Sequence, residues 1–219
     1  MLSVTITREL DELRREMVQE QIRDRGVRNP GVLDAMQRVP RHAFVSEDML
    51  AGAYADQPLP IGEGQTISQP WVVARMSELA RNGRDLDAVL EVGTGCGYQT
   101  AVLAHIARHV YTVERIGALV AKARRHLQSL KLRNVSLKHG DGSHDLGESL
   151  AVDAIVVTAG ATHVPTPLLR YLKPGGRMVI PVGQRHGVQD LLVITRDADG
   201  RAVKRRTLAV RFVPLTRER

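Results

Sequence analysis

The first eighty residues place apolar side chains at helical spacing, with one interruption that is rich in proline and glycine. Helices are predicted over residues 8–25, over residues 31–39 and from Pro70 onward. Residues 54–64 are predicted to be a loop, because prolines and glycines recur there. Pro70 suits the first position of the third helix, so Ser68 or Gln69 is expected at or beside its N-cap.

From residue 88 onward, short apolar segments alternate with amphipathic ones, as strands and helices do in α/β proteins. Strands are predicted at residues 89–92, 110–113, 135–138, 154–158, 177–181 and 191–195, with a last one between 202 and 213. Helices are predicted at residues 98–108, 117–130 and 166–172. This alternation indicates a mostly parallel seven-stranded sheet covered on both faces. Residues 197–200 read as a hairpin turn, so an antiparallel last strand is expected.

These elements predict an α/β, Rossmann-like fold in a single domain over residues 1–219. Residues 1–64 form an N-terminal helical extension and loop, and residues 65–219 form the α/β core. A chain of 219 residues with 43% hydrophobic residues is long enough to bury one core of this kind.

Composition narrows the partners and the location. No apolar run reaches the roughly 18 residues that span a bilayer, and no secretion signal opens the chain, so a cytoplasmic protein that contacts no membrane is expected. A monomer is also expected. The net charge is +7, but basic residues are scattered, with only Lys204–Arg206 in a run, so no specific nucleic-acid partner is predicted. Cys96 is the only cysteine and the eight histidines form no ligand cluster, so no metal site is expected.

The segment Leu-Glu-Val-Gly-Thr-Gly-Cys-Gly-Tyr, residues 90–98, places three alternating glycines between a predicted strand and a predicted helix. Such a turn presents bare backbone and a helix N-terminus to a ligand. The glycine spacing does not fit the dinucleotide fingerprint, and no Gly-Lys-Ser/Thr follows that would make a P-loop. Glu91 stands two residues before the first glycine, where a carboxylate would repel a pyrophosphate but attract a cation.

Two further acids follow the next two predicted strands. Glu114 can accept hydrogen bonds from ribose hydroxyls, and Asp141, between Gly140 and Gly142, can accept from an adenine amino group. Each acid alone is weak support, but three acids at the carboxyl ends of three successive strands favour a nucleoside that carries a positive charge. The sequence therefore predicts S-adenosyl-L-methionine as the cofactor, with S-adenosyl-L-homocysteine as the product.

Five segments of the chain together resemble the protein-L-isoaspartate O-methyltransferase family. They are residues 65–70 (QTISQP), 90–101 (LEVGTGCGYQTA), 113–116 (VERI), 140–142 (GDG) and 210–215 (VRFVPL). The resemblance implies methyl transfer to the α-carboxyl of L-isoaspartyl residues in damaged proteins, followed by closure to a succinimide that reopens partly to aspartate. It implies Ser68 as the active-site residue, with substrate contacts from Thr66, Ile67, Ser68, Gln69, Thr158 and Val182. The cofactor contacts that it implies are Glu91, Gly93, Thr94, Gly95, Glu114, Arg115, Asp141 and Gly142.

The chemistry of the reaction fits this assignment. A carboxylate is already a nucleophile, so the reaction needs no general base, and Ser68 is expected to orient the substrate at a helix N-terminus. The alternative that Ser68 is only a helix cap stays open. The chain departs from the family at residues 143–146 (SHDL) and 159–163 (AGATH), beside the expected cofactor and peptide. Two other functions stay open: a methyltransferase of a small molecule or nucleic acid, and an inactive cofactor-binding regulator.

Overall fold

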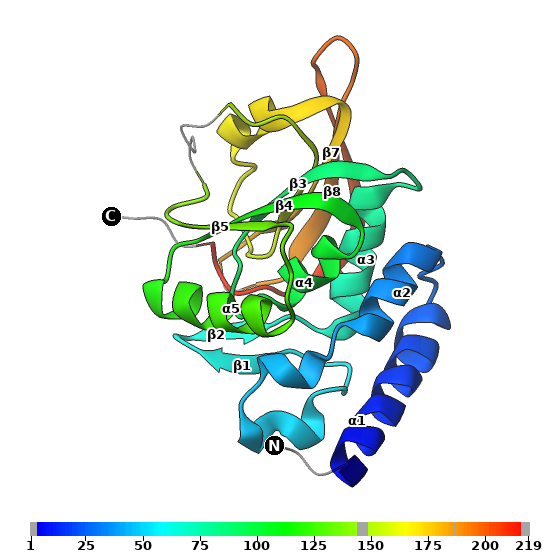
Figure 1. Ribbon diagram of the computed structural model, residues 1–219. Coiled ribbons are helices and arrows are strands. Elements are labelled where there is room, and N and C mark those ends of the chain that lie inside the picture. Colours follow the sequence, from blue (N-terminus) through cyan, green and yellow to red (C-terminus); the bar gives the residue numbers. More distant parts are fainter. Residues whose placement is uncertain (1–3, 144–148, 186, 216–219) are drawn as a thin grey trace.

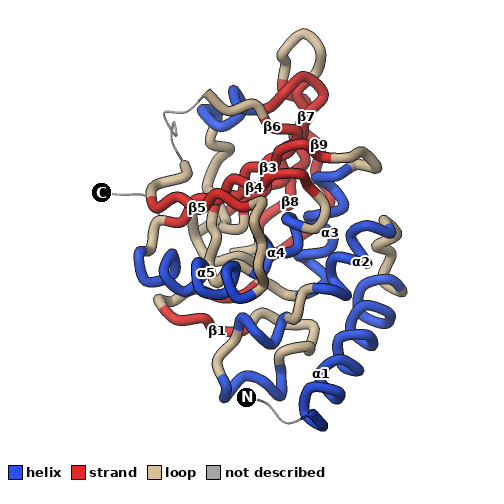
Figure 2. Tube along the Cα trace, in the orientation of Figure 1, coloured by secondary structure: helices blue, strands red, loops and turns tan. Residues whose placement is uncertain are grey.

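A single seven-stranded sheet forms the centre of the computed structural model, which describes residues 4–143, 149–185 and 187–215 (Figure 1, Figure 2). The strand order is β5-β4-β3-β6-β7-β8-β9. The strands are β3 (Leu86–Val92), β4 (Ala107–Glu114), β5 (Val135–His139), β6 (Val152–Val157), β7 (Leu172–Gly183), β8 (Gln189–Arg196) and β9 (Ala202–Val210).

The pairing within this sheet confirms the predicted fold class. Strands β3 to β7 pair in parallel, with Glu91 opposite Thr112 on one side and Val156 on the other. Strand β8 pairs antiparallel with β7, and β9 pairs antiparallel with β8. The reversed direction therefore belongs to β8, and β9 closes the edge. Because β3 is central and the sheet changes winding direction there, its carboxyl end is where a ligand is expected.

The long helices all pack on one face of the sheet. The apolar cluster on that face joins β3 residue Val89 and β4 residue Val110 to side chains from α3 (Pro70–Arg81), α4 (Tyr98–Ala104) and α5 (Gly117–Ser129). A separate cluster on the opposite face packs Leu90 and Ile155 against the 3₁₀ helix η4 (Thr166–Tyr171). Among the described residues, no helix is long and apolar enough to cross a membrane.

The N-terminal segment differs from the single helix predicted over residues 8–25. An α-helix, α1 (Val4–Glu16), passes into a π-helix, η1 (Met17–Arg23). Wide-turn hydrogen bonds mark the change, from Asp24 N to Gln19 O at 3.0 Å and from Val27 N to Ile22 O at 3.2 Å. The second helix is α2 (Pro30–Arg38), which the side chain of Asn29 caps, and two short 3₁₀ helices follow, η2 (Arg41–Phe44) and η3 (Glu47–Gly52).

The prediction of a plain loop over residues 54–64 was wrong. Strand β1 (Leu59–Gly62) pairs antiparallel with β2 (Gln65–Ile67), and Leu59 and Ile61 are buried while Pro60 and Gly62 are exposed. Proline is tolerated in β1 because this two-stranded sheet needs no hydrogen bond from residue 60 to a further strand. The hairpin lies below α4 and α5 in Figure 1, close to the glycine turn.

Most other boundaries shift by a few residues, and three of the differences have a clear structural reason. Helix α4 ends at Ala104, not at residue 108, because Ala107 already pairs with Leu86 as the start of β4. The helix predicted over residues 166–172 is the 3₁₀ helix η4, in a segment where Pro165 and Pro167 remove backbone donors. Strand β7 begins at Leu172 rather than at residue 177, which makes it the longest strand that the structure describes.

Candidate active site

The glycine turn between β3 and α4 adopts a backbone that suits glycine. Gly93, Gly95 and Gly97 have φ angles of 95°, 57° and 93°, in the region that residues with a side chain rarely occupy. At Gly93 a side chain would also collide with the hydroxyl of Thr158, which donates a hydrogen bond to the Gly93 carbonyl. The turn therefore brings the tips of β3 and β6 into direct contact.

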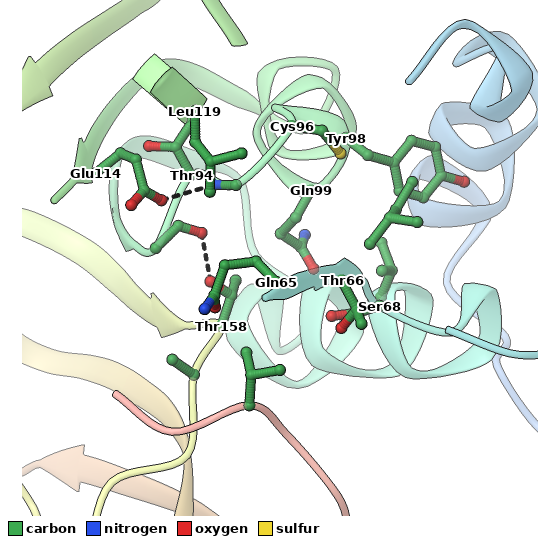
Figure 3. Close-up of a pocket in the computed structure, with 16 residues that line it drawn as sticks. Gln65, Thr66, Ser68, Thr94, Cys96, Tyr98, Gln99, Glu114, Leu119 and Thr158 are labelled. Atoms are coloured by element: carbon green, nitrogen blue, oxygen red, sulfur yellow. Dashed lines mark hydrogen bonds between the residues drawn. The ribbon is translucent and has the colours of Figure 1, made fainter. Parts of the chain in front are cut away.

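Glu114 lies at the tip of β4 with its carboxylate directed at the glycine turn (Figure 3). Its Oε2 accepts a hydrogen bond from Gly95 N at 2.8 Å, and its Oε1 accepts from Ile116 N at 2.8 Å. The side chain is buried but lines the cavity at the turn. Each carboxylate oxygen can accept more than one hydrogen bond, so the predicted contact to a ribose hydroxyl is compatible with these bonds.

Glu91 does not line that cavity; it lies behind the turn, facing α4. It is fully buried, and its Oε2 accepts hydrogen bonds from Thr112 Oγ1 at 2.6 Å and Thr100 Oγ1 at 2.5 Å. Thr112 in turn bonds Thr94 of the turn at 2.6 Å between the two hydroxyls. Burial raises the pKa of Glu91 to about 8, against the opposing effect of the two threonine hydroxyls. In this placement Glu91 is linked to the turn through Thr112 and Thr94, which sequence reasoning missed.

Asp141 and Gly142 follow β5, beside the tips of β3 and β4. Asp141 Oδ1 accepts hydrogen bonds from Ser143 N at 2.8 Å and Ser143 Oγ at 2.7 Å. A Cβ on Gly142 would lie 2.8 Å from Val92 Cγ1, so only glycine packs there without a shift. Arg115 follows Glu114 and is half-buried. None of these three residues lines the cavity, and the departure at His144, Asp145 and Leu146 lies outside the described residues.

The segment of residues 66–69 runs from strand β2 into helix α3. Gln69 is the N-cap residue and Pro70 takes the first helical position, as predicted. Ser68 is half-buried, and its hydroxyl has no hydrogen-bond partner among the described residues, so it does not cap α3. A hydroxyl at a helix N-terminus that makes no internal bond is available to an anionic ligand.

Two hollows meet at this segment. One, of about 60 Å³, lies against the glycine turn and includes Ile67, Thr94, Gly95 and Glu114 in its lining. The other, of about 510 Å³, includes Gln69, Trp71 and Phe212. Both are lined by the same four residues, Thr66, Ser68, Thr158 and Val213. We call the first the turn cavity and the second the outer groove.

The hairpin of β1 and β2 covers the turn cavity. A Cβ on Gly95 would lie 3.4 Å from Ile61 Cδ1, and Lys122 Nζ donates a hydrogen bond to the Ile61 carbonyl at 3.1 Å. These two contacts place Ile61 of the hairpin directly beside the glycine turn.

Of the predicted substrate residues, the structure brings Thr66, Ile67, Ser68, Gln69 and Thr158 to these hollows, but Val182 lines neither. Val182 lies in β7, where it bridges to Ala161. Sequence reasoning missed Trp71, Arg25 and Val213 as lining residues. Val213 belongs to the 210–215 segment that carried the family resemblance, so position in that motif could have signalled it.

Burial keeps two further titratable side chains near the turn, Cys96 and Tyr98, in their neutral forms. Burial raises the pKa of the Cys96 thiol to about 11 and that of Tyr98 to about 12, so both are neutral near pH 7. Cys96 is thus unsuited to act as a thiolate. Within residues 4–143, 149–185 and 187–215, no group of three histidine, cysteine, aspartate or glutamate side chains could hold a metal ion.

Comparison with known proteins identifies the family of this arrangement. The model of the protein-L-isoaspartate(D-aspartate) O-methyltransferase (PCMT) family matches residues 12–219. The chain belongs to this family. A family relative from Methylobacillus flagellatus, named protein-L-isoaspartate O-methyltransferase, is 50% identical over 202 residues, covering 92% of this chain and 91% of the relative. A second, named protein-L-isoaspartate O-methyltransferase 2, from Polaromonas sp., is 54% identical over 188 residues, covering 86% and 89%.

A solved structure shares the fold of this PCMT-family chain. It is a Plasmodium falciparum protein described as a protein-L-isoaspartate O-methyltransferase, crystallised with S-adenosyl-L-homocysteine. The match has a TM-score of 0.76 at 27% identity and covers 91% of this chain and 96% of that chain. The family predicted from five sequence segments is confirmed.

Proposed function

We propose that this protein transfers a methyl group from S-adenosyl-L-methionine to the α-carboxyl of L-isoaspartyl residues in damaged proteins. The family membership supports the reaction, and one observation of the structure supports its location: Ser68 lines both the turn cavity and the outer groove. A cofactor bound at the glycine turn and a peptide bound in the outer groove would meet there.

The turn cavity suits the nucleoside part of this cofactor. Gly95 leaves its backbone bare on the cavity wall, and the Glu114 carboxylate provides acceptors for ribose hydroxyls. We retain Gly93, Thr94, Arg115, Asp141 and Gly142 as proposed cofactor contacts and Glu91 as a residue that fixes the turn from behind. The cofactor supplies the electrophilic methyl group.

The outer groove suits an extended peptide that presents a carboxylate to Ser68. The two hollows are lined, beside Ser68, by Thr66, Ile67, Gln69 and Thr158. We propose that Val182 contacts the peptide outside these two hollows. A carboxylate oxygen attacks the methyl carbon, the carbon–sulfur bond breaks with its electron pair left on sulfur, and a methyl ester forms. No proton is removed from the nucleophile, so the protein has only to orient the carboxylate.

We propose that residues 1–219 form one methyltransferase domain. The N-terminal side chains Met17, Met36 and Phe44 belong to the same apolar cluster as Val89 of the sheet. The monomeric state and the cytoplasmic location stay predictions.

An assay with two versions of one peptide tests the function. The protein is expected to methylate the isoaspartyl version and not the aspartyl version. Ser68→Ala is expected to lower kcat about 10- to 100-fold, because it removes a hydrogen bond to a charged group. Ser46→Ala, an exposed serine whose side chain caps no helix, is the matched control. Methylation only of RNA or of a small metabolite would favour the first alternative, and cofactor binding without any methyl transfer would favour the regulator.

A further inference from the structure

Asp56 lies outside the five segments that carry the family resemblance, yet it contacts the residues that follow Ser68. Its Oδ2 accepts a hydrogen bond from Gln69 Nε2 at 2.6 Å, and its Oδ1 accepts from Trp71 N at 3.2 Å. Trp71 is the second residue of α3, whose own N-cap residue, Gln69, makes no side-chain cap. A carboxylate from an earlier loop therefore supplies the cap that the helix lacks.

The same carboxylate also pairs with a basic side chain, that of Arg25, at the outer groove. Arg25 Nη1 forms an ion pair with Asp56 Oδ2, and the Arg25 guanidinium lies 5.0 Å from the centroid of the Trp71 ring. Trp71 Nε1 returns a hydrogen bond to the Arg25 carbonyl at 3.3 Å. Because Arg25, Gln69 and Trp71 all line the outer groove, Asp56 joins three of its wall residues.

The loop that carries Asp56 is itself fixed from the protein interior. Arg41 is fully buried, and its guanidinium donates to the carbonyls of Ala53 at 2.8 Å and Gln57 at 3.3 Å, on either side of Asp56. The guanidinium also lies 4.9 Å from the centroid of the Tyr98 ring, at the start of α4. Both hydrogen bonds come from a fully buried side chain, so they tie the backbone on either side of Asp56 to the protein interior.

We propose that Asp56 is a positioning residue for methyl transfer, which holds Gln69 and the first turn of α3 so that Ser68 faces the junction of the two hollows. The inference rests on the proposed function for its kinetic readout. Asp56 lines neither hollow, so it acts through Gln69 and Trp71.

The kinetic test compares Asp56→Ala and Asp56→Asn with the wild type on an isoaspartyl peptide. Asp56→Ala is expected to lower kcat/KM at least about tenfold, because small displacements of positioning groups are costly in rate. The dissociation constant for S-adenosyl-L-homocysteine, measured by calorimetry, should stay within about twofold, since Asp56 does not line the turn cavity. Asp56→Asn should recover part of the loss, because its amide oxygen can still accept from Trp71 N. Asp48→Ala, an exposed acid in η3, is the control for charge.

A spectroscopic test does not depend on turnover. Trp71 is the only tryptophan, so its fluorescence reports the packing of this segment. Asp56→Ala should shift the Trp71 emission and weaken the response to added isoaspartyl peptide, and Asp48→Ala should do neither. A wild type that binds the peptide without methylating it would contradict the proposed function alone. Unchanged kcat/KM and unchanged emission in Asp56→Ala would overturn the inference, as would equal losses of cofactor and peptide binding. Should Asp56→Ala not fold, Asp56→Asn decides by the same measurements.

Discussion

The carboxylate of Glu114 accepts a hydrogen bond from the backbone N–H of Gly95 at 2.8 Å, which joins the tip of β4 to the glycine turn that follows β3. One side chain thus fixes the shape of the turn and also places a negative charge on the wall of the turn cavity. The two roles can be separated, because binding of the cofactor and stability of the fold are measured independently.

Replacing Glu114 with Gln keeps the shape of the side chain and removes its charge. We expect the dissociation constant for S-adenosyl-L-methionine to rise about 10- to 100-fold, since hydrogen bonds to charged groups contribute about 1.5–3 kcal/mol. Isothermal titration calorimetry measures this change. Glu47→Gln, an exposed acid in η3, should bind the cofactor as the wild type does. Equal affinities of Glu114→Gln and wild type would contradict the proposed ribose contact.

Gly93 and Gly26 form a matched pair for testing the turn, because their φ angles are 95° and 96°. A Cβ on Gly26 meets nothing within 4 Å, whereas one on Gly93 meets the Thr158 hydroxyl. Both Ala variants therefore place a side chain at nearly the same positive φ, which costs about 1–2 kcal/mol. Urea unfolding should show that Gly93→Ala lowers the free energy of unfolding by at least about 1 kcal/mol more than Gly26→Ala does. Adding Thr158→Ala should restore most of that difference, and equal losses at Gly93 and Gly26 would refute the collision.

The middle of the sheet could be predicted because β3 and β6 are largely buried on both faces and read as apolar runs. The hairpin of β1 and β2 was missed because Pro58, Pro60, Gly62 and Gly64 outweighed the alternation of Leu59 and Ile61. Short strands outside the main sheet gain little from propensity and form through contacts such as that between Lys122 and Ile61, which no local pattern contains.

The candidate site was predictable where a local motif carries the chemistry and not where distant segments meet. The glycine turn and Ser68 stand in such motifs. The position of Glu91 follows from strand alternation, since it lies between Leu90 and Val92 and so faces α4 on the side opposite to them. Asp56 had no signal, because its contacts to Gln69 and Trp71 depend on a loop that Arg41 fixes from the interior.

Gly160 belongs to the segment that departs from the family pattern, and its surroundings in the structure favour a glycine at this position. A Cβ on Gly160 would lie 2.9 Å from Gln189 Nε2, and Gln189 is buried. Gln189 Oε1 in turn accepts a hydrogen bond from Phe212 N at 2.7 Å, which holds the wall of the outer groove. Gly160→Ala should therefore destabilise the fold by about 1–3 kcal/mol and raise KM for the peptide.

The matched variant for Gly160 is Gly52→Ala, where the nearest atoms lie 3.9 and 4.0 Å from the added Cβ. It should change neither the free energy of unfolding by more than about 0.5 kcal/mol nor the KM. Urea unfolding and peptide kinetics measure the two effects. A Gly160→Ala protein with wild-type KM would show that Gln189 does not transmit the change to Phe212.

Glu91 predicts a specific dependence of stability on pH. Its pKa is about 8 in the folded protein, raised by burial from an ordinary value of 4.5. Between pH 4.5 and 8 the folded state thus binds more protons at this site than the unfolded state does, so stability is lost as the pH rises through this window. Below the window both states are protonated and Glu91 contributes no slope.

Glu91→Gln removes this titration while leaving an oxygen that accepts from Thr100 and Thr112. The Tm of the variant relative to wild type should therefore increase between pH 5 and pH 8.5, by several degrees, since each unit of pKa shift corresponds to about 1.4 kcal/mol. Differential scanning calorimetry across this range measures it, with Glu47→Gln as the exposed control whose difference should stay constant. Parallel Tm curves for Glu91→Gln and wild type would mean that Glu91 is ionised in the folded protein, and the carboxylate behind the glycine turn would then carry the negative charge that its sequence position suggested.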